Sequence, residues 1–318
     1  MSAADDYREK IRAEALATGA SDVGFAAASE VDAQFLSQYA DWLSRGDNAT
    51  MEYMERHAAL RRHPALLLEG CRTVISLAFP YYTPESYTPE RRSEALPAIA
   101  RYALSRDYHK ALRKRLKPLC GFIENNYGGA TRTCVDTAPL PERYWALKSG
   151  IGRAGMNGCV ITERGGSYVF LAEILTTLEI EPDIPQNETC LRCGACVRTC
   201  PTKALRADGT IDARRCLSYL TIEHRGLLSP EQQKILASPE GRDTLYGCDR
   251  CQQCCPHNRG IAPEVIPDFK PRADILALTA ADIAGMTEQD WDLLTRGSAM
   301  RRADFPAMQA HARASLKK

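Results

Sequence analysis

The cysteines of this chain are its clearest chemical signal. The segment CLRCGACVRTCPTKAL, residues 190–205, follows the pattern Cys-x2-Cys-x2-Cys-x3-Cys-Pro. This spacing is typical of [4Fe–4S] sites, in which the first three thiolates hold one cluster and the cysteine before proline ligates another. Cys190, Cys193 and Cys196 therefore lack one ligand, and Cys200 lacks three.

A second run, GCDRCQQCCPHN, and a single cysteine ahead of it can supply the missing ligands. Cys255 precedes a proline just as Cys200 does, so the two runs look like the halves of a pseudo-symmetric two-cluster ferredoxin module. By this symmetry the ligands of the first cluster are Cys190, Cys193, Cys196 and Cys255. The ligands of the second are Cys200, Cys216, Cys248 and Cys251.

One cysteine of the second run, Cys254, is left over, and we expect it to be a small buried residue. Two zinc sites would also take four thiolates each, but eight cysteines at this spacing favour iron–sulfur clusters. The chain has 13 cysteines in all. In a chain expected in the cytoplasm, that number favours metal or redox chemistry over disulfides.

The bulk composition sets broad limits on the protein. A length of 318 residues, 44% of them hydrophobic, suffices for two modest domains or one large domain with an insert. The net charge of +1 restricts any nucleic-acid contact to local patches. The charged N-terminal segment has no signal-peptide core, and no run approaches about 18 apolar residues. We therefore expect a cytoplasmic protein without a transmembrane helix.

Helical and extended patterns alternate ahead of the cysteine runs. We expect helices in residues 7–19, 31–46, 108–128 and 141–150. We expect strands from Asp22, at 74–79, up to Asp136, and in residues 159–162 and 167–175, with a Pro-rich loop from Tyr82. The chain thus reads as α+β, with an α/β-like domain in residues 1–180, the cysteine module in 181–265 and a short helical tail in 266–318.

Asp136 ends a predicted strand and is followed by TAPLPERYW. A carboxyl at the C-terminal end of a strand, facing a crevice, is a usual place for chemistry in α/β sheets. Apolar surroundings can raise its pKa so that it acts as a general acid. The alternative is an N-cap for the following helix, a role that Thr137 could also take. The spacing does not decide between these two roles.

Three other motifs have plainer alternatives. GIGRAG, residues 150–155, matches Gly-x-Gly-x-x-Gly, but it lies after a helix and before a strand, the reverse of a dinucleotide site. Asp107-x-His109 resembles the start of a cobalt-ligating Asp-x-His-x-x-Gly motif, yet Leu112 replaces the glycine. We therefore expect a helix-start histidine and no protein histidine on cobalt. RRH, residues 61–63, reads on its own as a solvated charge run.

Taken together, these pieces resemble epoxyqueuosine reductases, a family of cobalamin-dependent tRNA-modifying enzymes. The combination is specific, because a cysteine module alone would match many electron carriers. The matching segments lie in order over most of residues 1–265 and are RRHPALLLEGCRTVISLAFPY, SRDYH, VDTAPLPERYWALKSGIG, the first cysteine run, RCLSYLTIEHRG and LYGCDRCQQCCPHNRG.

The resemblance implies a cobalamin-binding N-terminal domain, related to that of reductive dehalogenases, ahead of a domain with two [4Fe–4S] clusters. It implies reduction of the epoxide of epoxyqueuosine, at the wobble position of tRNA, to the cyclopentene of queuosine. Asp136 matches the proton donor of the family, at the cobalamin site, and Arg61 matches a basic residue that contacts cobalamin. The positions that line the corrin in relatives correspond to Val160, Leu171, Ser218 and Asp249.

The chain also departs from the family pattern. Met156 stands where relatives often carry lysine, and a short tail replaces their helical-repeat extension. We expect tRNA phosphates to meet basic residues of the tail or of the HRG and HNR segments beside the clusters, with a solvated basic tail as the alternative. The basic residues of the tail are Arg296, Arg301, Arg302, Arg313, Lys317 and Lys318.

The expected partners are a tRNA anticodon stem-loop that carries epoxyqueuosine and a low-potential electron donor, with no membrane. By analogy with relatives we expect a monomer. Two rival functions remain. One is a reductive dehalogenase-like enzyme acting on a small organohalide, although such enzymes usually carry a twin-arginine signal that is absent here. The other is a two-cluster electron carrier, which the size of the N-terminal domain disfavours.

Overall fold

The computed structural model describes residues 3–84, 98–186, 190–263 and 266–317. The Pro-rich loop predicted from Tyr82 lies mostly outside these residues, as does Lys318. The helices and strands predicted ahead of the cysteine runs are confirmed, with ends that shift by a few residues.

Before the first cysteine run the helices are α1 (Ala3–Ala17), α2 (Ala33–Ser44), α3 (Glu52–Arg56), α4 (Tyr108–Tyr127) and α5 (Glu142–Lys148). The strands are β1 (Asp22–Ala27), β2 (Thr73–Pro80), β3 (Ala98–Ile99), β4 (Thr131–Cys134), β5 (Arg153–Ala154), β6 (Val160–Ile161) and β7 (Val169–Thr176). The cysteine module contains α6 (Ala195–Thr199), α7 (Leu217–Ile222), α8 (Pro230–Ala237), α9 (Pro239–Arg242), β8 (Thr244–Tyr246) and α10 (Arg250–Gln253). The tail contains α11 (Ala273–Leu276), α12 (Ala280–Gly285), α13 (Glu288–Thr295) and α14 (Phe305–Ser315).

A four-stranded sheet in the order β1-β2-β7-β4 organises the N-terminal part. All three of its strand pairs are antiparallel. The expectation for Asp136 assumed a parallel α/β sheet, in which strand ends meet at one edge. Antiparallel neighbours run in alternate directions, so the place of Asp136 is set by the loop that follows β4. The protein is α+β, as predicted.

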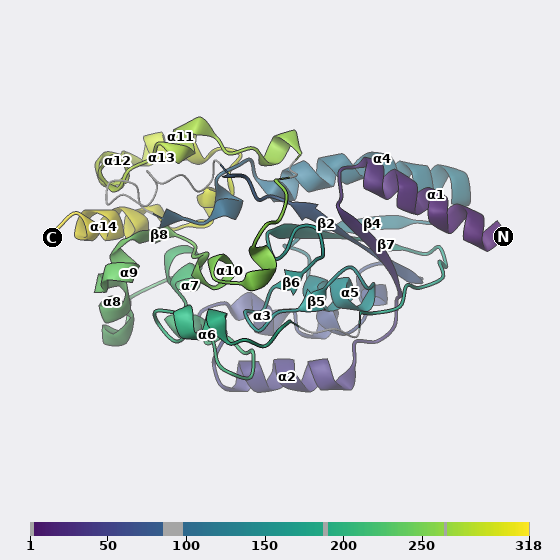
Figure 1. Cartoon of the computed structure of the whole chain (residues 1–318), viewed down its shortest axis with the longest axis horizontal. Coiled ribbons are helices and arrows are strands. Elements are labelled where there is room, and N and C mark those ends of the chain that lie inside the picture. Colours follow the sequence, from purple (N-terminus) through teal and green to yellow (C-terminus); the bar gives the residue numbers. More distant parts are fainter. Residues whose placement is uncertain (1–2, 85–97, 187–189, 264–265, 318) are drawn as a thin grey trace.

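Helices cover both faces of this sheet (Figure 1). On one face, Leu112 and Leu116 of α4 pack with α1 against Ile75 of β2, and all three side chains are fully buried. On the other face, Val74 packs with Trp145 of α5. Neighbouring residues of β2 serve opposite faces because side chains alternate along a strand. Every residue of β2 is buried, and the sheet forms the centre of the N-terminal core.

The start and end of α4 are well defined, and its start bears directly on the site described below. Asp107 is the N-cap, and its carboxylate accepts a hydrogen bond from the backbone N–H of His109. The helix ends at Gly128, which takes a left-handed φ of +73°. The capping carboxylate therefore lies beside the side chain of the second helical residue.

The cysteine module and the tail share a second core with the N-terminal part. β3 pairs in parallel with β8, which joins residues far apart in the sequence. Residues from all three predicted segments are buried together in this core: Ile99, Leu104, Ile222, Leu245, Tyr246, Ile275, Trp291, Met300 and Met308. The tail helices are thus packed onto the module, as Figure 1 shows on the side away from the N-terminus.

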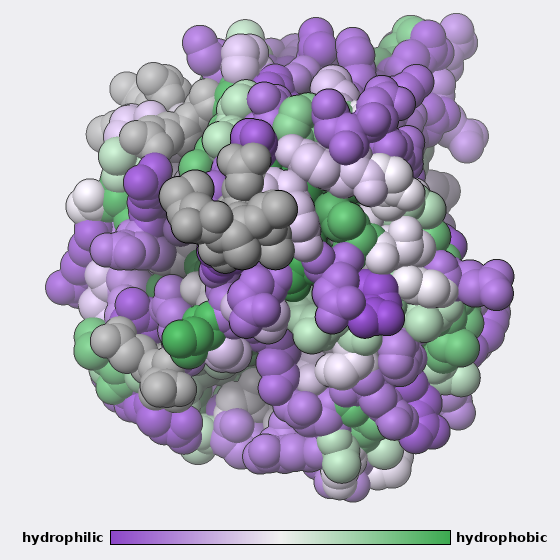
Figure 2. Space-filling view, turned by 90° about the vertical axis from the view of Figure 1, so that its right-hand side faces the viewer, coloured by the Kyte–Doolittle hydropathy of each residue, from purple (hydrophilic) through white to green (hydrophobic). Residues whose placement is uncertain are grey.

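The surface at the N-terminal end of α1 is mostly hydrophilic, with apolar side chains scattered among polar ones (Figure 2). Within the described residues, no helix combines the length and apolar character needed to cross a membrane. The apolar side chains of the described helices instead gather in buried cores, chiefly on the two faces of the sheet and under the tail.

One polar side chain lies deep inside the N-terminal core. Glu173 of β7 is fully buried and lies opposite Ser76 of β2, on the face covered by α5. Neither carboxyl oxygen of Glu173 has a hydrogen-bond partner within the described residues. Burial, and then the charge of Glu142, raises the pKa of Glu173 far above its ordinary value. The carboxyl is therefore neutral near pH 7.

We expect Glu173→Gln to resist alkaline pH better than the wild-type protein. The folded pKa of Glu173 is raised, so its contribution to stability is complete only below the ordinary glutamate pKa of about 4.3 and is lost as pH rises. Glutamine stays neutral at all these pH values. The difference in melting temperature, variant minus wild type, should therefore increase as pH rises from about 5 to about 8. Thermal unfolding measures this, with the exposed Glu181→Gln as control. Identical pH profiles for the two variants would contradict the assignment.

Candidate active site and cluster-binding cysteines

Asp136 lies beyond the end of β4, in the loop that leads to α5. Its backbone is left-handed, with φ of +52°, a conformation that aspartate adopts more readily than most residues. α5 begins after Pro141, so Asp136 is not its N-cap. Instead, the backbone N–H of Asp136 donates to the carboxylate of Glu142 in the first turn of that helix. The side chain of Asp136 is 55% exposed and can meet a ligand.

His109 links Asp136 to a second carboxylate. Its Nε2 lies 2.9 Å from Oδ2 of Asp136, and its Nδ1 lies 2.7 Å from Oδ1 of Asp107. A carboxylate on each ring nitrogen holds the ring as an imidazolium that donates to both. The prediction of a histidine at a helix start was correct, but it missed this contact across the site.

The proton of this group rests on His109. Burial would lower the pKa of His109, but the hydrogen bonds to Asp107 and Asp136 raise it to about 9. Partial desolvation by the surrounding protein would raise the pKa of Asp136. The hydrogen bond and charge of His109 outweigh this effect and hold the pKa of Asp136 below its ordinary value. The expected raised pKa at Asp136 is therefore wrong, because the sequence did not show the cation beside it.

Glu142 holds a second proton close by. Burial, and then the charge of Asp136, raises the pKa of Glu142 to about 8. Tyr108 stacks on the ring of His109, with ring centroids 4.0 Å apart. Near neutral pH the group therefore contains an ionised, exposed Asp136 with protons on His109 and Glu142. Sequence reasoning missed Glu142 and Tyr108, although both lie in segments that carried the family resemblance.

Arg61 lies in a 3₁₀ turn (Ala59–Arg62) near the same loop. Its guanidinium approaches the carbonyl oxygen of Leu140 at 3.5 Å and the sulfur of Met54 at 3.8 Å. Its Nε is buried and has no partner within the described residues. A buried donor of this kind normally finds an acceptor, so the Arg61 side chain suits a ligand that carries acceptor groups.

A residue of the tail also reaches the surroundings of Asp136. Arg302 forms two hydrogen bonds with Glu223, at 2.8 and 2.7 Å. Its guanidinium lies over the ring of Tyr53, 5.8 Å from the centroid, and Tyr53 lies within electrostatic range of Asp136 and Arg61. The tail thus contributes a cation beside the exposed carboxyl.

The fold brings the first predicted set of thiols together. α6 and α10, one from each cysteine run, pack against each other. A small cavity is lined by all four predicted ligands of the first cluster, Cys190, Cys193, Cys196 and Cys255, and also by Met156. Cys254 does not line it, and its thiol donates to the carbonyl oxygen of Cys251 at 3.6 Å. Cys254 is partly exposed, so the expectation of a buried residue is wrong.

The second set of thiols is gathered deeper in the module. Cys216 lies within electrostatic range of Cys200, Cys248 within range of Cys216, and Cys251 within range of both Cys248 and Cys216. Cys159 lies within electrostatic range of Cys251, Cys255 and Cys196, so a further thiol stands near both predicted sets. The predicted sets, four sulfur donors each, fit the donor chemistry of two [4Fe–4S] clusters.

The four predicted corrin-lining residues differ in exposure and in their protein partners. Val160 is only 4% exposed and packs in a small apolar core, with Leu171 partly buried against it. Asp249 is 7% exposed and forms a buried ion pair with Arg101 at 3.7 Å. Ser218 is partly exposed in α7. Leu171 and Ser218 are therefore accessible in part, whereas Val160 and the carboxylate of Asp249 already have protein partners.

A basic groove lies beside the start of α4. It is lined by six Arg or Lys residues and three Asp or Glu residues, contributed by α1, α4 and the tail. Lys110 and Lys114 of α4 are exposed in it, and Asp107, which bonds His109, forms part of its wall. Arg296 of the tail also lines the groove and lies 3.3 Å from Asp292. The groove is thus adjacent to the Asp136 site.

Comparisons with known proteins agree on one family. The model described as "Epoxyqueuosine reductase QueG, DUF1730" matches residues 61–137, and a "4Fe-4S double cluster binding domain" matches residues 189–258. The chain is 37% identical to epoxyqueuosine reductase of Gloeobacter violaceus over 312 residues, covering 96% of this chain and 95% of that one. It is 37% identical to the Escherichia coli enzyme over 263 residues, covering 82% and 68%.

Solved structures give the same result. A crystal structure of epoxyqueuosine reductase with an epoxyqueuosine-modified tRNA-Tyr stem loop matches with a TM-score of 0.87 at 28% identity, covering 98% of this chain and 81% of that one. The Bacillus subtilis enzyme, with an aspartate-bearing catalytic loop swung out of the active site, matches with a TM-score of 0.85 at 26% identity, covering 98% and 82%.

The two adjacent cysteines of the second run give a matched test of the ligand set. We expect Cys255→Ala to lower the iron content from about eight to about four atoms per chain, because it removes the fourth thiolate of the first cluster. Cys254→Ala should leave the iron content unchanged. Iron and sulfide analysis of anaerobically reconstituted protein measures both. Equal loss in the two variants, or loss in Cys254→Ala alone, would overturn the assignment.

Proposed function

The chain belongs to the epoxyqueuosine reductase family, and from this premise we propose that the Asp136 loop is where the epoxide is protonated and opened. The protein reduces epoxyqueuosine in tRNA to queuosine. The observation that carries the proposal is the exposed Asp136 carboxyl, hydrogen-bonded to a protonated His109. The related Bacillus subtilis enzyme, whose structure shows a catalytic loop that carries an aspartate, supports it.

The reaction fixes what the site must provide. An epoxide, two electrons and two protons give an alkene and one molecule of water, with both carbon–oxygen bonds broken. The oxygen leaves as an alkoxide unless a nearby acid protonates it, and a positioned acid contributes about 10²- to 10⁴-fold to such steps. His109 and Glu142, near Asp136, each hold one proton, and each turnover consumes two protons.

We assign Asp136 as the group that touches the epoxide oxygen and His109 as the group that resupplies it. The ionised Asp136 accepts the Nε2 proton of His109 along their 2.9 Å hydrogen bond and passes a proton to the oxygen as the carbon–oxygen bond breaks. Asp107 stabilises the imidazolium before transfer and fixes the orientation of the ring. This route lets a carboxyl with a low pKa act as a proton donor at neutral pH.

The electrons require cofactors that the residues present can hold. The two thiol sets match two [4Fe–4S] clusters, which pass single electrons. Cobalamin would supply a reduced cobalt that attacks or reduces the epoxide. Arg61, whose buried Nε lacks a partner within the described residues, would hold an acceptor group of the corrinoid. Leu171 and Ser218, both partly exposed, would line it as well.

Nucleoside mass spectrometry tests this function. Anaerobic, reconstituted protein with epoxyqueuosine-bearing tRNA and a strong chemical reductant should form queuosine only when cobalamin is present. Asp136→Asn should lower the single-turnover rate by about 10²-fold or more. His109→Gln should lower the rate less and remove the decline in activity as pH rises through about 9, where wild-type His109 loses its proton. Full turnover by Asp136→Asn would refute its role.

We also propose that the basic groove beside α4 binds phosphates of the anticodon stem. Its Lys110 and Lys114 are exposed, and it lies next to the Asp107–His109 pair that serves the reactive carboxyl. Phosphate contacts of this kind position RNA without reading its sequence. The related enzyme solved with a tRNA stem loop supports such a complex.

Lys110→Glu/Lys114→Glu should weaken binding of the stem-loop by about tenfold or more at low salt and flatten its salt dependence, because two phosphate contacts are lost. The matched control is Lys203→Glu/Lys234→Glu, which makes the same charge change at exposed sites that do not line the groove. Fluorescence anisotropy with labelled stem-loop measures both. Equal losses in the two double variants would count against the groove.

A further inference from the structure

One of the two thiol groups lies at the protein surface. Among the 13 cysteines, all of which the structure describes, Cys193 is the exposed one. The cavity lined by its set is also lined by Leu191, which is 67% exposed. The thiols of the second set are only partly exposed, and Cys216 and Cys251 are deeply enclosed. The first set is thus the outer one, and electrons from another protein reach it by the shorter path.

The cavity lies in a basic part of the chain. Its lining comes from residues 155–157, 161, 190–196 and 255–257, which contain one Arg, Arg192, and no Asp or Glu. Five more Arg lie within six residues of these stretches in the sequence, against three acids, which are Glu163, next to Arg164, Glu188, and Asp249, which pairs with Arg101. The basic residues are Arg153, Arg164, Arg192, Arg198, Arg250 and Arg259. Arg192 and Arg259 are exposed, and neither forms an ion pair within the described residues. A net charge of +1 for the whole chain makes this local excess notable.

We propose that this surface, Leu191 with the surrounding basic residues, is the docking site of a small electron-carrier protein with an acidic face. Its centre is apolar, with Leu191 beside the exposed Cys193, and its rim is basic. Transient redox complexes use small interfaces of this composition, in which complementary charge speeds the encounter. The inference rests on the proposed function, since it takes the first thiol set to hold a cluster.

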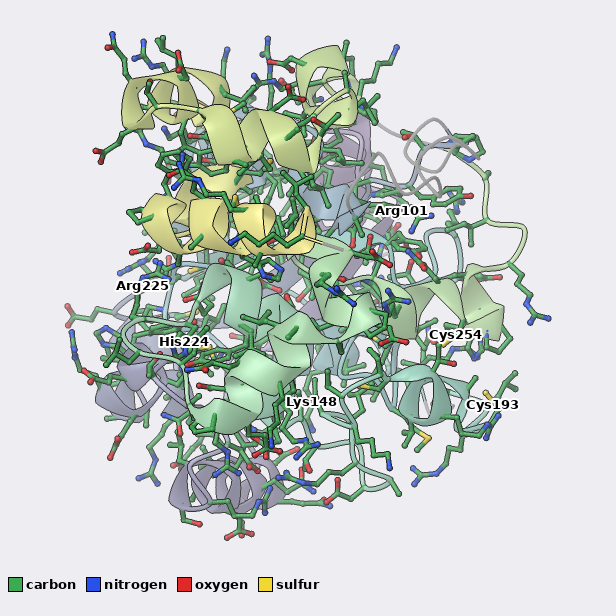
Figure 3. The ribbon with its side chains drawn as sticks, turned by 90° about the vertical axis from the view of Figure 1, so that its left-hand side faces the viewer. Arg101, Lys148, Cys193, His224, Arg225 and Cys254 are labelled. Carbon is green, nitrogen blue, oxygen red and sulfur yellow. The ribbon has the colours of Figure 1, made fainter. Side chains whose placement is uncertain are left out.

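The position of the surface favours a protein carrier over RNA. Figure 3 places Cys193 at one edge of the molecule and Arg225 at the other. Arg225 donates to the backbone of Arg302, the tail residue that reaches the surroundings of Asp136. Substrate RNA must meet Asp136, whereas an electron donor must approach the outer thiols. Separate faces allow both partners to be bound at once.

The electron count is consistent with such a carrier. Each epoxide consumes two electrons, so a one-electron carrier, a reduced flavin or iron–sulfur protein, must dock and depart twice per turnover. The carrier is oxidised by one electron at each visit, and the two protons come from the Asp136 site. Repeated visits require weak binding with fast release, and an exposed, charge-steered surface provides this.

The test uses purified oxidised flavodoxin, an acidic carrier, as the probe, and the full chain with its clusters loaded. Arg192→Glu/Arg259→Glu should weaken flavodoxin binding by about tenfold or more at low salt and lower its salt dependence. The control Lys117→Glu/Lys234→Glu makes the same charge change elsewhere and should alter binding less than about threefold. Iron content confirms that the clusters remain. If charge reversal disturbs them, Arg192→Gln/Arg259→Gln gives the same test with a smaller expected loss.

Two further readouts separate this proposal from the proposed function. With a chemical reductant, Arg192→Glu/Arg259→Glu should form queuosine at the wild-type rate, whereas reduced flavodoxin should support it poorly. Arg259 lies in the HNR segment, where the sequence predicted a tRNA contact. We assign Arg259 to the carrier instead, so the affinity of the double variant for the tRNA stem-loop should be unchanged. Equal flavodoxin binding by this variant and the control would overturn the docking site. Loss of stem-loop binding without loss of flavodoxin binding would show that the surface serves RNA instead.

Discussion

The hydrogen bond between His109 and Asp136 governs the chemistry available to this site. It joins the first turn of α4 to the loop after β4, and a third element, α5, holds the backbone of that loop through Glu142. Asp107 caps α4 and binds the other nitrogen of the His109 ring, so the start of one helix sets the protonation state of a carboxyl on another segment. The site can therefore keep an acidic proton near neutral pH while its exposed carboxylate is ionised.

The attachment of the cysteine module to the sheet domain is equally constrained. Asp249 lies between two predicted ligands, Cys248 and Cys251, and forms its ion pair with Arg101 of the N-terminal part. A buried ion pair is costly unless its remaining groups are satisfied. Here Asp249 also accepts from the backbone N–H of Arg101 at 2.8 Å, and the guanidinium of Arg101 donates to the hydroxyl of Tyr168 at 3.0 Å. This contact and the β3–β8 pair fix the thiols relative to the sheet.

The groups that hold protons and the thiols that face a redox partner lie in different parts of the fold. Protons are held at the junction of α4, α5 and the loop after β4, whereas the outer thiols face a basic surface near α6 and α10. The tail contributes to the proton side through Arg302 and Arg296. Its helices share a core with β8, so the tail is part of the fold that shapes the site and not an appendage.

The sequence determined the local structure and the cysteine chemistry. Helices and strands of the N-terminal part follow from residue periodicity and from stop signals such as Gly128, which act over a few residues. The two predicted sets of thiols followed from the cysteine spacing, from the two Cys-Pro pairs and from the pseudo-symmetry of the two runs. The sequence also identified Asp136 as a candidate site residue, but it predicted a raised pKa where the structure gives a lowered one.

The tertiary structure decided everything that depends on contacts between distant segments. His109 lies 27 residues from Asp136, and no periodicity reports that their side chains meet. The antiparallel order of the sheet, the burial of Val160, the pairing of Asp249 and the surface position of Cys193 also arise from packing. A pKa depends on the charges within a few ångströms, and only the folded chain brings those charges together.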